Sequence, residues 1–280
     1  MSGEGEFRSV DAWRKIAGAS WGRPLDPQIF GDIEVDAGAL LTFLEAERER
    51  SGVHVTVTHL VGKALAHALA ENPDVNVRLR RGRFVRRESV DVFFVVALSE
   101  GKELSGAKIR DADRKSAGQI ARELVERAER LRAGEDAELG GSKRLLGRTP
   151  TWLLRWVLRF ATWLVADLGV NLKRLGLPSD AFGSAIVSSV STFGAERAYG
   201  PLNPWYRVPV LVLVSEVKQK AVVIDGEIVA RPMLTLSATL DHRYLDGSHA
   251  GRLVRSARAY LGDPTAFEPV ASSDPVVETT

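Results

Sequence analysis

The chain has 280 residues, a formal net charge of +2 and no cysteine. The lack of cysteine excludes disulfides, thiolate zinc sites and a cysteine nucleophile. The small net charge gives no general affinity for nucleic acid, so no nucleic-acid partner is expected. The N-terminal stretch MSGEGEFRSVDAW lacks the basic and then apolar pattern of a signal peptide, which predicts a cytoplasmic protein.

The first part of the chain alternates between helix and strand patterns. Residues 36–52 have helical spacing and end at a glycine that can cap a helix. The stretch from Val53 is predicted to start as a short strand of β-branched residues and to continue as an alanine-rich helix that stops at Asn72-Pro73. A hairpin turning near Gly82 and an apolar strand at 90–98 should follow.

The second part is predicted to contain an amphipathic helix, two strands, a hairpin and a closing helix. The amphipathic helix is expected at 113–135 and places Ile120, Leu124 and Leu131 on one face. The strands are expected within 183–194 and 208–217, the hairpin turn at Asp225-Gly226, and the closing helix within 246–264. Because helices and strands alternate, with hairpins between them, the predicted fold class is α/β, a two-layer sandwich with helices packed on a mixed sheet.

Residues 149–177 stand apart because they hold three of the six tryptophans. A membrane-spanning helix is not expected, since Arg155 and Arg159 near its centre would each cost roughly 2.5–3.5 kcal/mol on insertion scales. Two interpretations stay open. The segment is a helix buried in the fold or between subunits, or it lies on a membrane surface or a partner through its large aromatic residues. These aromatic residues are Trp152, Trp156, Phe160 and Trp163.

A histidine-containing motif, LDHRYLDGSHAG, follows the strand-like run MLTLSATL. A strand end places His242 at the rim of a sheet, where a substrate can reach it, and a neutral imidazole can take a proton from a thiol or a hydroxyl. Asp246, four residues later, can anchor the turn by hydrogen bonds or pair with an arginine. Gly247 allows close backbone approach at the helix start. On residue chemistry alone, a structural role for this pair stays open beside a catalytic one.

The surroundings of the motif carry a family resemblance. MLTLSATLDHRYLDGSHAGRLVRSARAYLGDP resembles the C-terminal signature of the dihydrolipoyl acyltransferase catalytic domain, the core of 2-oxo acid dehydrogenase complexes. The shared pattern is a methionine-leucine strand, D-H-R-x-x-D-G, and a helix ending near D-P. The shorter H-x-x-x-D-G is similar to chloramphenicol acetyltransferase, of the same fold superfamily. ENPDVNV, IRDADRKSAGQIARELVERAERLRAGE, and SSVSTFG with the later Asn203-Pro204 are similar to further family blocks, in the family's order, over about residues 31–264.

The resemblance implies a mechanism and a set of site residues. His242 would be the general base that deprotonates the thiol of coenzyme A or of a lipoyl group. Ser188 of a neighbouring subunit would donate a hydrogen bond to the oxyanion, with Ser189 as the fallback if the alignment slips by one residue. Asp246 would organise the site, and Arg243 and Gly247 would support it. The implied fold is a chloramphenicol acetyltransferase-like mixed sheet that forms homotrimers with sites between subunits, and coenzyme A is the implied substrate.

Six arginines between residues 78 and 87 form the densest positive patch of the sequence. We favour an exposed hairpin that carries them, although they could also attract the phosphates of coenzyme A or an acidic partner. They are Arg78, Arg80, Arg81, Arg83, Arg86 and Arg87. The other histidines are interpreted as surface or core residues, and no metal site is predicted. They are His54, His59, His67 and His249.

The resemblance divides the chain into an N-terminal extension at 1–30, a catalytic-like domain at 31–264 and a polar tail at 265–280. The tryptophan-rich segment becomes an insertion at about 145–180. No lipoyl or subunit-binding domain fits these parts, so a stand-alone trimer is expected. A lipoyl-bearing protein or another 2-oxo acid dehydrogenase component would then be its partner in trans.

Two departures from the family support an alternative function. GKELSGAK replaces the family's apolar run before R-D-A-D, and the tryptophan-rich insertion precedes the serine strand. The leading hypothesis is a coenzyme A-dependent acyltransferase acting on a dihydrolipoyl-type thiol or another acceptor. The alternative is a structural or assembly protein that keeps the trimer, has lost turnover, and binds a partner complex or a membrane surface through residues 149–177. The acyl group and the acceptor stay open at this point.

Overall fold

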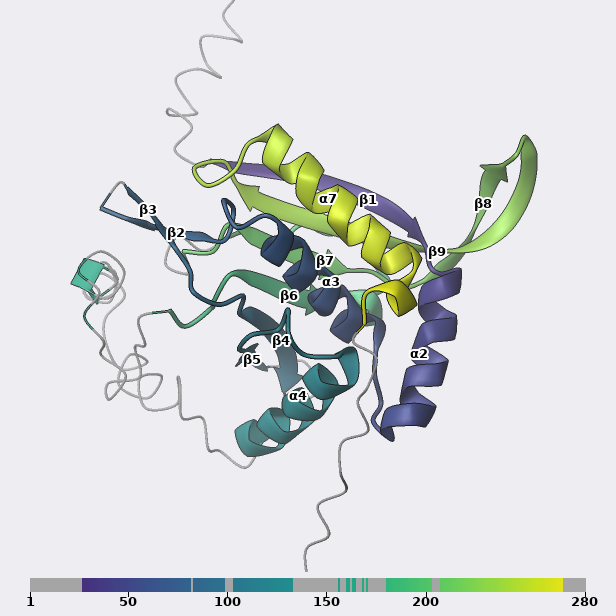
Figure 1. Cartoon of the computed structure of the whole chain (residues 1–280), viewed down its shortest axis with the longest axis horizontal. Coiled ribbons are helices and arrows are strands. Elements are labelled where there is room, and N and C mark those ends of the chain that lie inside the picture. The colour runs from purple at the N-terminus through teal and green to yellow at the C-terminus, as the bar shows by residue number, and fades with distance from the viewer. Residues whose placement is uncertain are drawn as a thin grey trace, which may run out of the picture.

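The computed structural model of the chain describes residues 27–81, 83–98, 103–132, 180–202 and 207–268, together with seven separate positions between 156 and 170. Its centre is a seven-stranded mixed sheet with helices packed against one face (Figure 1). A separate two-stranded hairpin, β2 (Val77–Arg80) and β3 (Arg83–Arg86), lies beside it. The predicted α/β fold, a mixed sheet with helices packed on it, is confirmed.

The strand directions decide where the ends of the sheet lie. β4, β6 and β7 are parallel to one another, whereas β1 and β7 are both antiparallel to β9. The carboxyl ends of β6 and β9 therefore lie at opposite ends of the sheet. In sheet order the strands are β1 (Gln28–Asp36), β9 (Glu227–Asp241), β7 (Val210–Val214), β6 (Ala185–Ser189), β4 (Val92–Leu98) and β5 (Glu103–Ile109), with β8 (Lys218–Ile224) paired to β9.

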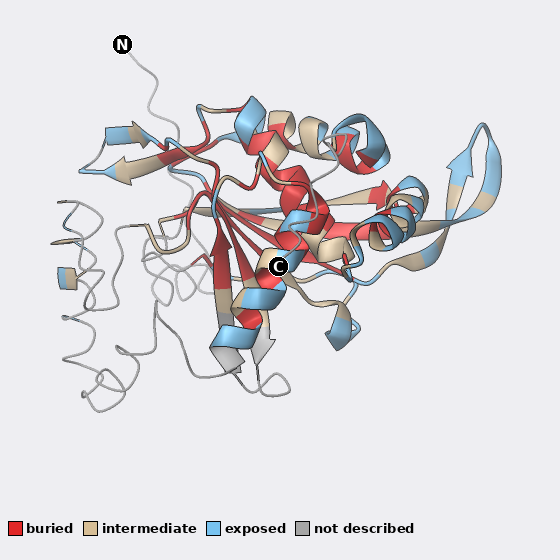
Figure 2. Ribbon diagram, turned by 60° about the horizontal axis from the view of Figure 1, so that its bottom comes forward, coloured by how far each residue is buried: buried red, intermediate tan, exposed pale blue. Residues whose placement is uncertain are grey.

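The two faces of the sheet are buried by different clusters. The larger cluster fills the space between the sheet and the helices and includes Val187 and Leu234 of the strands and Leu60 and Leu261 of the helices. Figure 2 shows these buried residues concentrated along the central strands and the helices above them. A smaller cluster that includes Ile186 covers the other face. The helices are α2 (Gly38–Ser51), α3 (Val57–Glu71), α4 (Ala117–Arg132) and α7 (Gly247–Gly262).

Several local predictions are confirmed because they rest on backbone rules. Gly52 ends α2 with a φ of 65° and donates its N–H to the carbonyl of Arg48. Asp225 and Gly226 both have positive φ, 52° and 88°, as a two-residue hairpin turn between β8 and β9 requires. On α4, Ile120 and Leu124 are both buried, whereas the side chain of Leu131 lies outside the described part. The hairpin predicted near residue 82 is present as β2–β3.

The short strand predicted from Val53 is wrong. Thr56 is instead the N-cap of α3, because its hydroxyl accepts a hydrogen bond from the backbone N–H of His59 at 3.4 Å. In return, Nδ1 of His59 accepts the backbone N–H of Thr56 at 3.2 Å. This capping box overrides the strand preference of the β-branched residues and starts the helix at Val57.

Two further differences concern strands. The strand predicted within 183–194 ends at Ser189, and a short 3₁₀ helix at Ser191–Phe193 follows it. β1 was not predicted, and the expected domain boundary at residue 31 falls inside it. β1 is an edge strand with much exposed surface, so its sequence QIFGDIEVD lacks the continuous apolar run of a central strand.

Most of residues 149–177, and all of the extension before residue 27, lie outside the described residues. Within 149–177 the described aromatic side chains Trp156, Phe160 and Trp163 are 63%, 60% and 48% exposed in the single chain. Both interpretations of the segment, burial between subunits and contact with a membrane or partner, stay predictions. Among the described residues, no helix combines the length and the apolar character needed to cross a membrane.

Candidate active site

The loop between β9 and α7 presents His242 to solvent. The backbone N–H of His242 donates to the carbonyl of Pro27 at 2.8 Å, beside the start of β1. Tyr244 and Leu245 are 5% and 2% exposed, and their N–H groups donate to the carbonyl of Asp241 at 2.9 and 3.3 Å. The loop is therefore anchored on both sides of His242, whose own side chain is exposed.

Asp241 and Arg243 form an ion pair across His242. The guanidinium of Arg243 contacts both carboxylate oxygens of Asp241, with Nε at 3.0 and 3.1 Å and Nη2 at 2.5 Å. The backbone N–H of Arg243 also donates to Asp241 at 3.0 Å. The side chain of Asp241 is 7% exposed and that of Arg243 is 43% exposed. This forked contact fixes the backbone that carries His242.

Asp246 is the N-cap of α7. Its carboxylate accepts the backbone N–H groups of Ser248 at 2.9 Å and of His249 at 3.1 Å. It also contacts Nδ1 of His249 at 2.6 Å. The hydrogen bonds from the side chain and backbone of His249 hold the pKa of Asp246 well below its usual range. Gly247 is the first residue of the helix. The structure thus gives Asp246 a role in anchoring the turn, and its part in catalysis stays a prediction.

His249 has a structural role that was not predicted from the sequence. It occupies the N3 position of α7 and completes a capping box with Asp246. Its Nε2 lies 3.4 Å from a carboxylate oxygen of Asp74, which also pairs with Arg252. The sequence contained the signal for this capping box. Asp246 is a good N-cap acceptor, and three residues later the side chain of His249 can accept the backbone N–H of the N-cap.

Ser188 and Ser189 lie next to each other at the carboxyl end of β6 and face opposite sides of the sheet. Ser188 shares the face of Ile186, away from the helices, and is half-buried. Ser189 shares the helix-covered face with Val187, and its Oγ lies 2.8 Å from Oγ of Ser191.

One chain does not bring His242 and Ser188 together. Ser188 is level with Leu213 of β7, and Leu213 is level with Ser237 of β9. His242 lies five residues further along the chain than Ser237, towards the opposite end of the sheet. With the usual rise per residue and strand spacing, the two residues are on the order of 20 Å apart. The predicted serine donor for His242 must therefore come from another chain or be a different group.

The arginine-rich hairpin lies against the histidine loop. The ring of Tyr244 is 6.2 Å from that of Phe84 in β3, and its hydroxyl donates to the carbonyl of Arg207 at 3.4 Å. The prediction of an exposed hairpin is wrong for one member, Arg87, which is buried. Arg87 lies beyond the end of β3 and pairs with Asp180, because a buried guanidinium needs a carboxylate partner. The remaining five arginines are exposed or half-buried.

Side chains of the types that ligate metals do not cluster in the described part of the chain. No group of three or more histidine, aspartate or glutamate side chains there could hold a metal ion.

Comparison with known proteins identifies the family. The family model described as "2-oxoacid dehydrogenases acyltransferase (catalytic domain)" matches residues 27–142 and 175–268. The chain belongs to this family. The match leaves out residues 143–174, which include most of the tryptophan-rich segment. The family consists of acyltransferases, so the predicted resemblance to the dihydrolipoyl acyltransferase catalytic domain is confirmed.

Individual relatives agree with the family. The dihydrolipoyllysine-residue acetyltransferase component of the acetoin cleaving system of Bacillus subtilis is 28% identical over 220 residues, which cover 78% of this chain and 44% of that protein. The lipoamide acyltransferase component of a branched-chain alpha-keto acid dehydrogenase complex of the same organism is 23% identical over 239 residues, 84% of this chain and 46% of that protein. The chain thus spans less than half of the length of these relatives.

Solved structures share the fold. Dihydrolipoamide acetyltransferase of Azotobacter vinelandii superposes with a TM-score of 0.63 at 25% identity, over 94% of each chain. That structure was described with the roles of a serine, a histidine and an asparagine in the catalytic mechanism, the last two being four positions apart. A probable dihydrolipoamide acetyltransferase of Listeria monocytogenes has the same TM-score at 22% identity, over 96% of this chain and 97% of that one.

Proposed function

We propose that this chain catalyses coenzyme A-dependent acyl transfer between coenzyme A and a thiol of the dihydrolipoyl type. The observation that carries the proposal is the position of His242 in a chain of this family. Its side chain is exposed, while Asp241, Arg243, Tyr244 and Leu245 around it are held by ion pair, hydrogen bonds and burial. Such an arrangement gives a base a fixed position and leaves it open to a substrate.

The proposed step needs one base and one oxyanion donor. His242 takes the proton from the acceptor thiol, and the resulting thiolate attacks the carbonyl carbon of the acyl-coenzyme A thioester. The tetrahedral intermediate then collapses, the bond between the acyl carbon and the coenzyme A sulfur breaks, and His242 returns the proton to that sulfur. No redox partner is required. Coenzyme A is thus a substrate in this proposal.

The oxyanion donor is proposed to be Ser188 of a neighbouring subunit in a homotrimer. Three observations support this assignment. His242 and Ser188 of one chain lie at opposite ends of the sheet. The β8–β9 hairpin projects from the body, and its residues Val223 and Ile228 are 69% and 77% exposed (Figures 1 and 2). A structure of the cubic core of a pyruvate dehydrogenase multienzyme complex superposes at 25% identity with a TM-score of 0.63.

Asp246 is proposed to act by positioning the loop. The spacing from His242 to Asp246 equals the spacing between the histidine and the asparagine named for the Azotobacter vinelandii enzyme. Asparagine and aspartate are equally good N-caps, so both can hold the start of α7. The proposed acceptor is a dihydrolipoyl group carried by another protein, because the relatives are named for transfer to dihydrolipoyllysine residues. The cytoplasmic location stays a prediction.

The test is to replace the base. His242→Ala should lower the turnover of acetyl-coenzyme A with dihydrolipoamide about a hundred- to ten-thousandfold, the usual range for losing a general base. The release of free coenzyme A measures the rate. His54→Ala is the matched control, because His54 is exposed on the connection between α2 and α3. A His242→Ala variant with wild-type turnover would overturn the assignment, and a wild-type chain that transfers no acyl group would overturn the function.

A further inference from the structure

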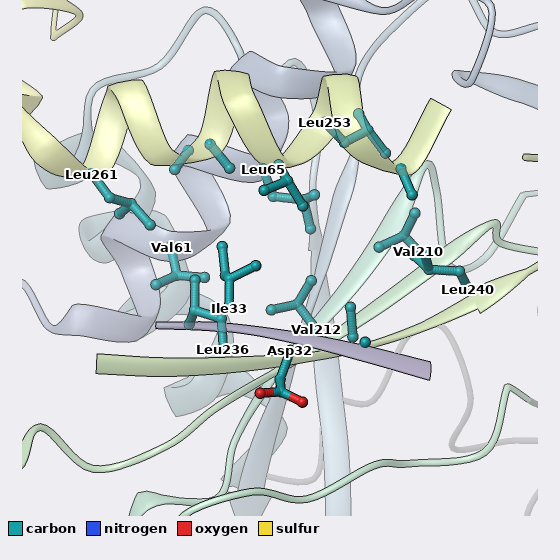
Figure 3. A pocket seen from close by; sticks show the side chains of 16 residues that line it. Asp32, Ile33, Val61, Leu65, Val210, Val212, Leu236, Leu240, Leu253 and Leu261 are labelled. Carbon is teal, nitrogen blue, oxygen red and sulfur yellow. The ribbon is translucent and has the colours of Figure 1, made fainter. Parts of the chain in front are cut away.

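An apolar cavity lies between the helices and the sheet, and no residue of the loop from 241 to 246 lines it. It has a volume of about 170 Å³ and lies between α3 and α7 on one side and β1, β9 and β7 on the other (Figure 3). For comparison, an engineered apolar cavity of roughly 150 Å³ stays dry and binds benzene. A cavity of this size and lining is therefore suited to a hydrocarbon.

Small residues that face each other create the space. Gly31 of β1 is paired with Ala238 of β9, and Ala250 and Ala257 of α7 also line the cavity. A Cβ atom placed on Gly31 would meet no atom within 4 Å, and Gly31 is exposed. Larger side chains at these positions would fill the space, as the close packing of protein interiors normally requires. The cavity thus reaches the surface at Gly31.

The lining offers nothing to a polar ligand. Asp32 is the one titratable residue among the sixteen that line the cavity. Its carboxylate points away from the cavity in Figure 3, and it accepts a hydrogen bond from the hydroxyl of Tyr199 at 2.6 Å and contacts Arg197 at 3.2 Å. A ligand that enters this space gains from burial of apolar surface alone.

The lining of the cavity runs along β9 and reaches the base of the histidine loop. Alternate residues of β9 from Leu236 to Leu240 line it, a distance of about 13 Å along a strand. Leu240 is two residues before His242, and Leu240 is level with Val210 at the same end (Figure 3). On the helix side, Ala250 donates its N–H to the carbonyl of Asp246 at 3.0 Å. A chain bound along the cavity therefore ends beside the proposed catalytic loop.

We propose that this cavity binds the hydrocarbon part of the acyl group, so that the protein prefers medium-chain aliphatic acyl thioesters to acetyl thioesters. The inference rests on the proposed function for the class of ligand, an acyl thioester. The cavity itself determines the length of the hydrocarbon that the ligand carries. A hydrocarbon of roughly six to eight carbons matches its volume by comparison with the benzene-binding cavity. Each buried methylene improves affinity about fourfold.

The test compares the binding of octanoyl-coenzyme A and acetyl-coenzyme A by calorimetry, without an acceptor, on the full chain. The wild type should bind octanoyl-coenzyme A at least tenfold more tightly than acetyl-coenzyme A. Gly31→Leu, which fills the cavity, should bring this ratio close to one. Gly262→Leu is the matched control, because its Cβ also meets nothing within 4 Å and Gly262 does not line the cavity. This control should keep the wild-type ratio.

Equal binding of the two thioesters by the wild type would overturn the inference, and so would a folded Gly31→Leu chain that keeps the preference. If a second copy of the chain or residues 1–26 filled the cavity instead, the two thioesters would also bind equally. Ala257→Leu fills the cavity from α7 and serves if Gly31→Leu does not fold. The same binding measurement on His242→Ala separates the two proposals, because the chain-length preference does not depend on the proposed base. If the wild type prefers octanoyl-coenzyme A but shows no turnover, the result supports the cavity proposal and overturns only the proposed function.

Discussion

The two ends of the sheet differ in how much of the candidate site one chain completes. At the histidine end, the loop around His242 is anchored by Pro27, by the Asp241–Arg243 pair and by the cap at Asp246. At the serine end, β6 stops after Ser189 in a short 3₁₀ helix. Ser188 there faces the side of the sheet with the smaller hydrophobic cluster. Folding of one chain thus fixes the loop that carries His242, whereas in the proposed site Ser188 acts together with His242 of a second chain.

The largest expected effect on turnover comes from replacing one of the two serines at the carboxyl end of β6, and the other serine serves as its comparison. Ser188→Ala should lower kcat about a hundred- to a thousandfold, as loss of one oxyanion donor does in comparable sites. Ser189→Ala should have a small effect, because Ser189 faces the helices and contacts Ser191. Steady-state turnover of acetyl-coenzyme A with dihydrolipoamide measures both variants. The reverse pattern would assign the donor to Ser189 and contradict the position given to Ser188.

The next effect concerns a histidine on the helix-covered side of β4. The ring of His59 packs edge-on to that of Phe94, and its burial, with a smaller contribution from His54, lowers its pKa from 6.5 to about 4. Between these two pH values the unfolded chain binds more protons than the folded one. The free energy of unfolding should therefore fall as the pH decreases from 6.5 to 4, by about 3 kcal/mol in total. Denaturant unfolding at several pH values measures this loss.

His59→Gln is the matched variant for that measurement. Glutamine at the third helical position also completes a capping box but does not titrate in this range. The variant should lose the part of the pH dependence that belongs to His59 while keeping α3. An unchanged pH profile would show that the half-buried ring of His59 does not control acid stability.

The smallest effect tests the anchoring of the histidine end. Arg243→Ala removes the partner of the nearly buried carboxylate of Asp241 and should reduce the free energy of unfolding by about 2 kcal/mol. Turnover should fall as well, since the loop that carries His242 loses one of its anchors. Arg258→Ala on the exposed side of α7 is the control and should change neither quantity. Equal stability of the two variants would show that the ion pair does not hold the loop.

Local rules in the sequence predicted much of the fold. Gly52 as a helix cap and Asp225-Gly226 as a hairpin turn were predictable because each depends on the backbone preference of one or two residues. The strand expected at Val53 failed because the capping box of Thr56 and His59 outweighs β propensity. The anchoring of the turn by Asp246 was predicted from its place before Gly247.

Other features depend on how strands are arranged and could not be derived from local residue patterns. The separation of His242 and Ser188 follows from the antiparallel pairing of β7 with β9, which brings together segments distant in the chain. The cavity at Gly31 likewise arises because Gly31 and Ala238 become neighbours across two strands. Arg87 is buried, unlike its neighbouring arginines, because it lies beyond the end of β3 and its guanidinium contacts Asp180 and the carbonyl of Arg207, both far along the chain.

The central claim, that each site combines His242 of one chain with Ser188 of another, is tested most directly by mixing two inactive variants. Co-expressed His242→Ala and Ser188→Ala chains would form mixed trimers in which some sites have an intact histidine from one chain and an intact serine from its neighbour. In random trimers from equal amounts, roughly a quarter of the sites should be intact, and turnover should recover to that level. Turnover that stays at the level of the separate variants would contradict a site shared between chains.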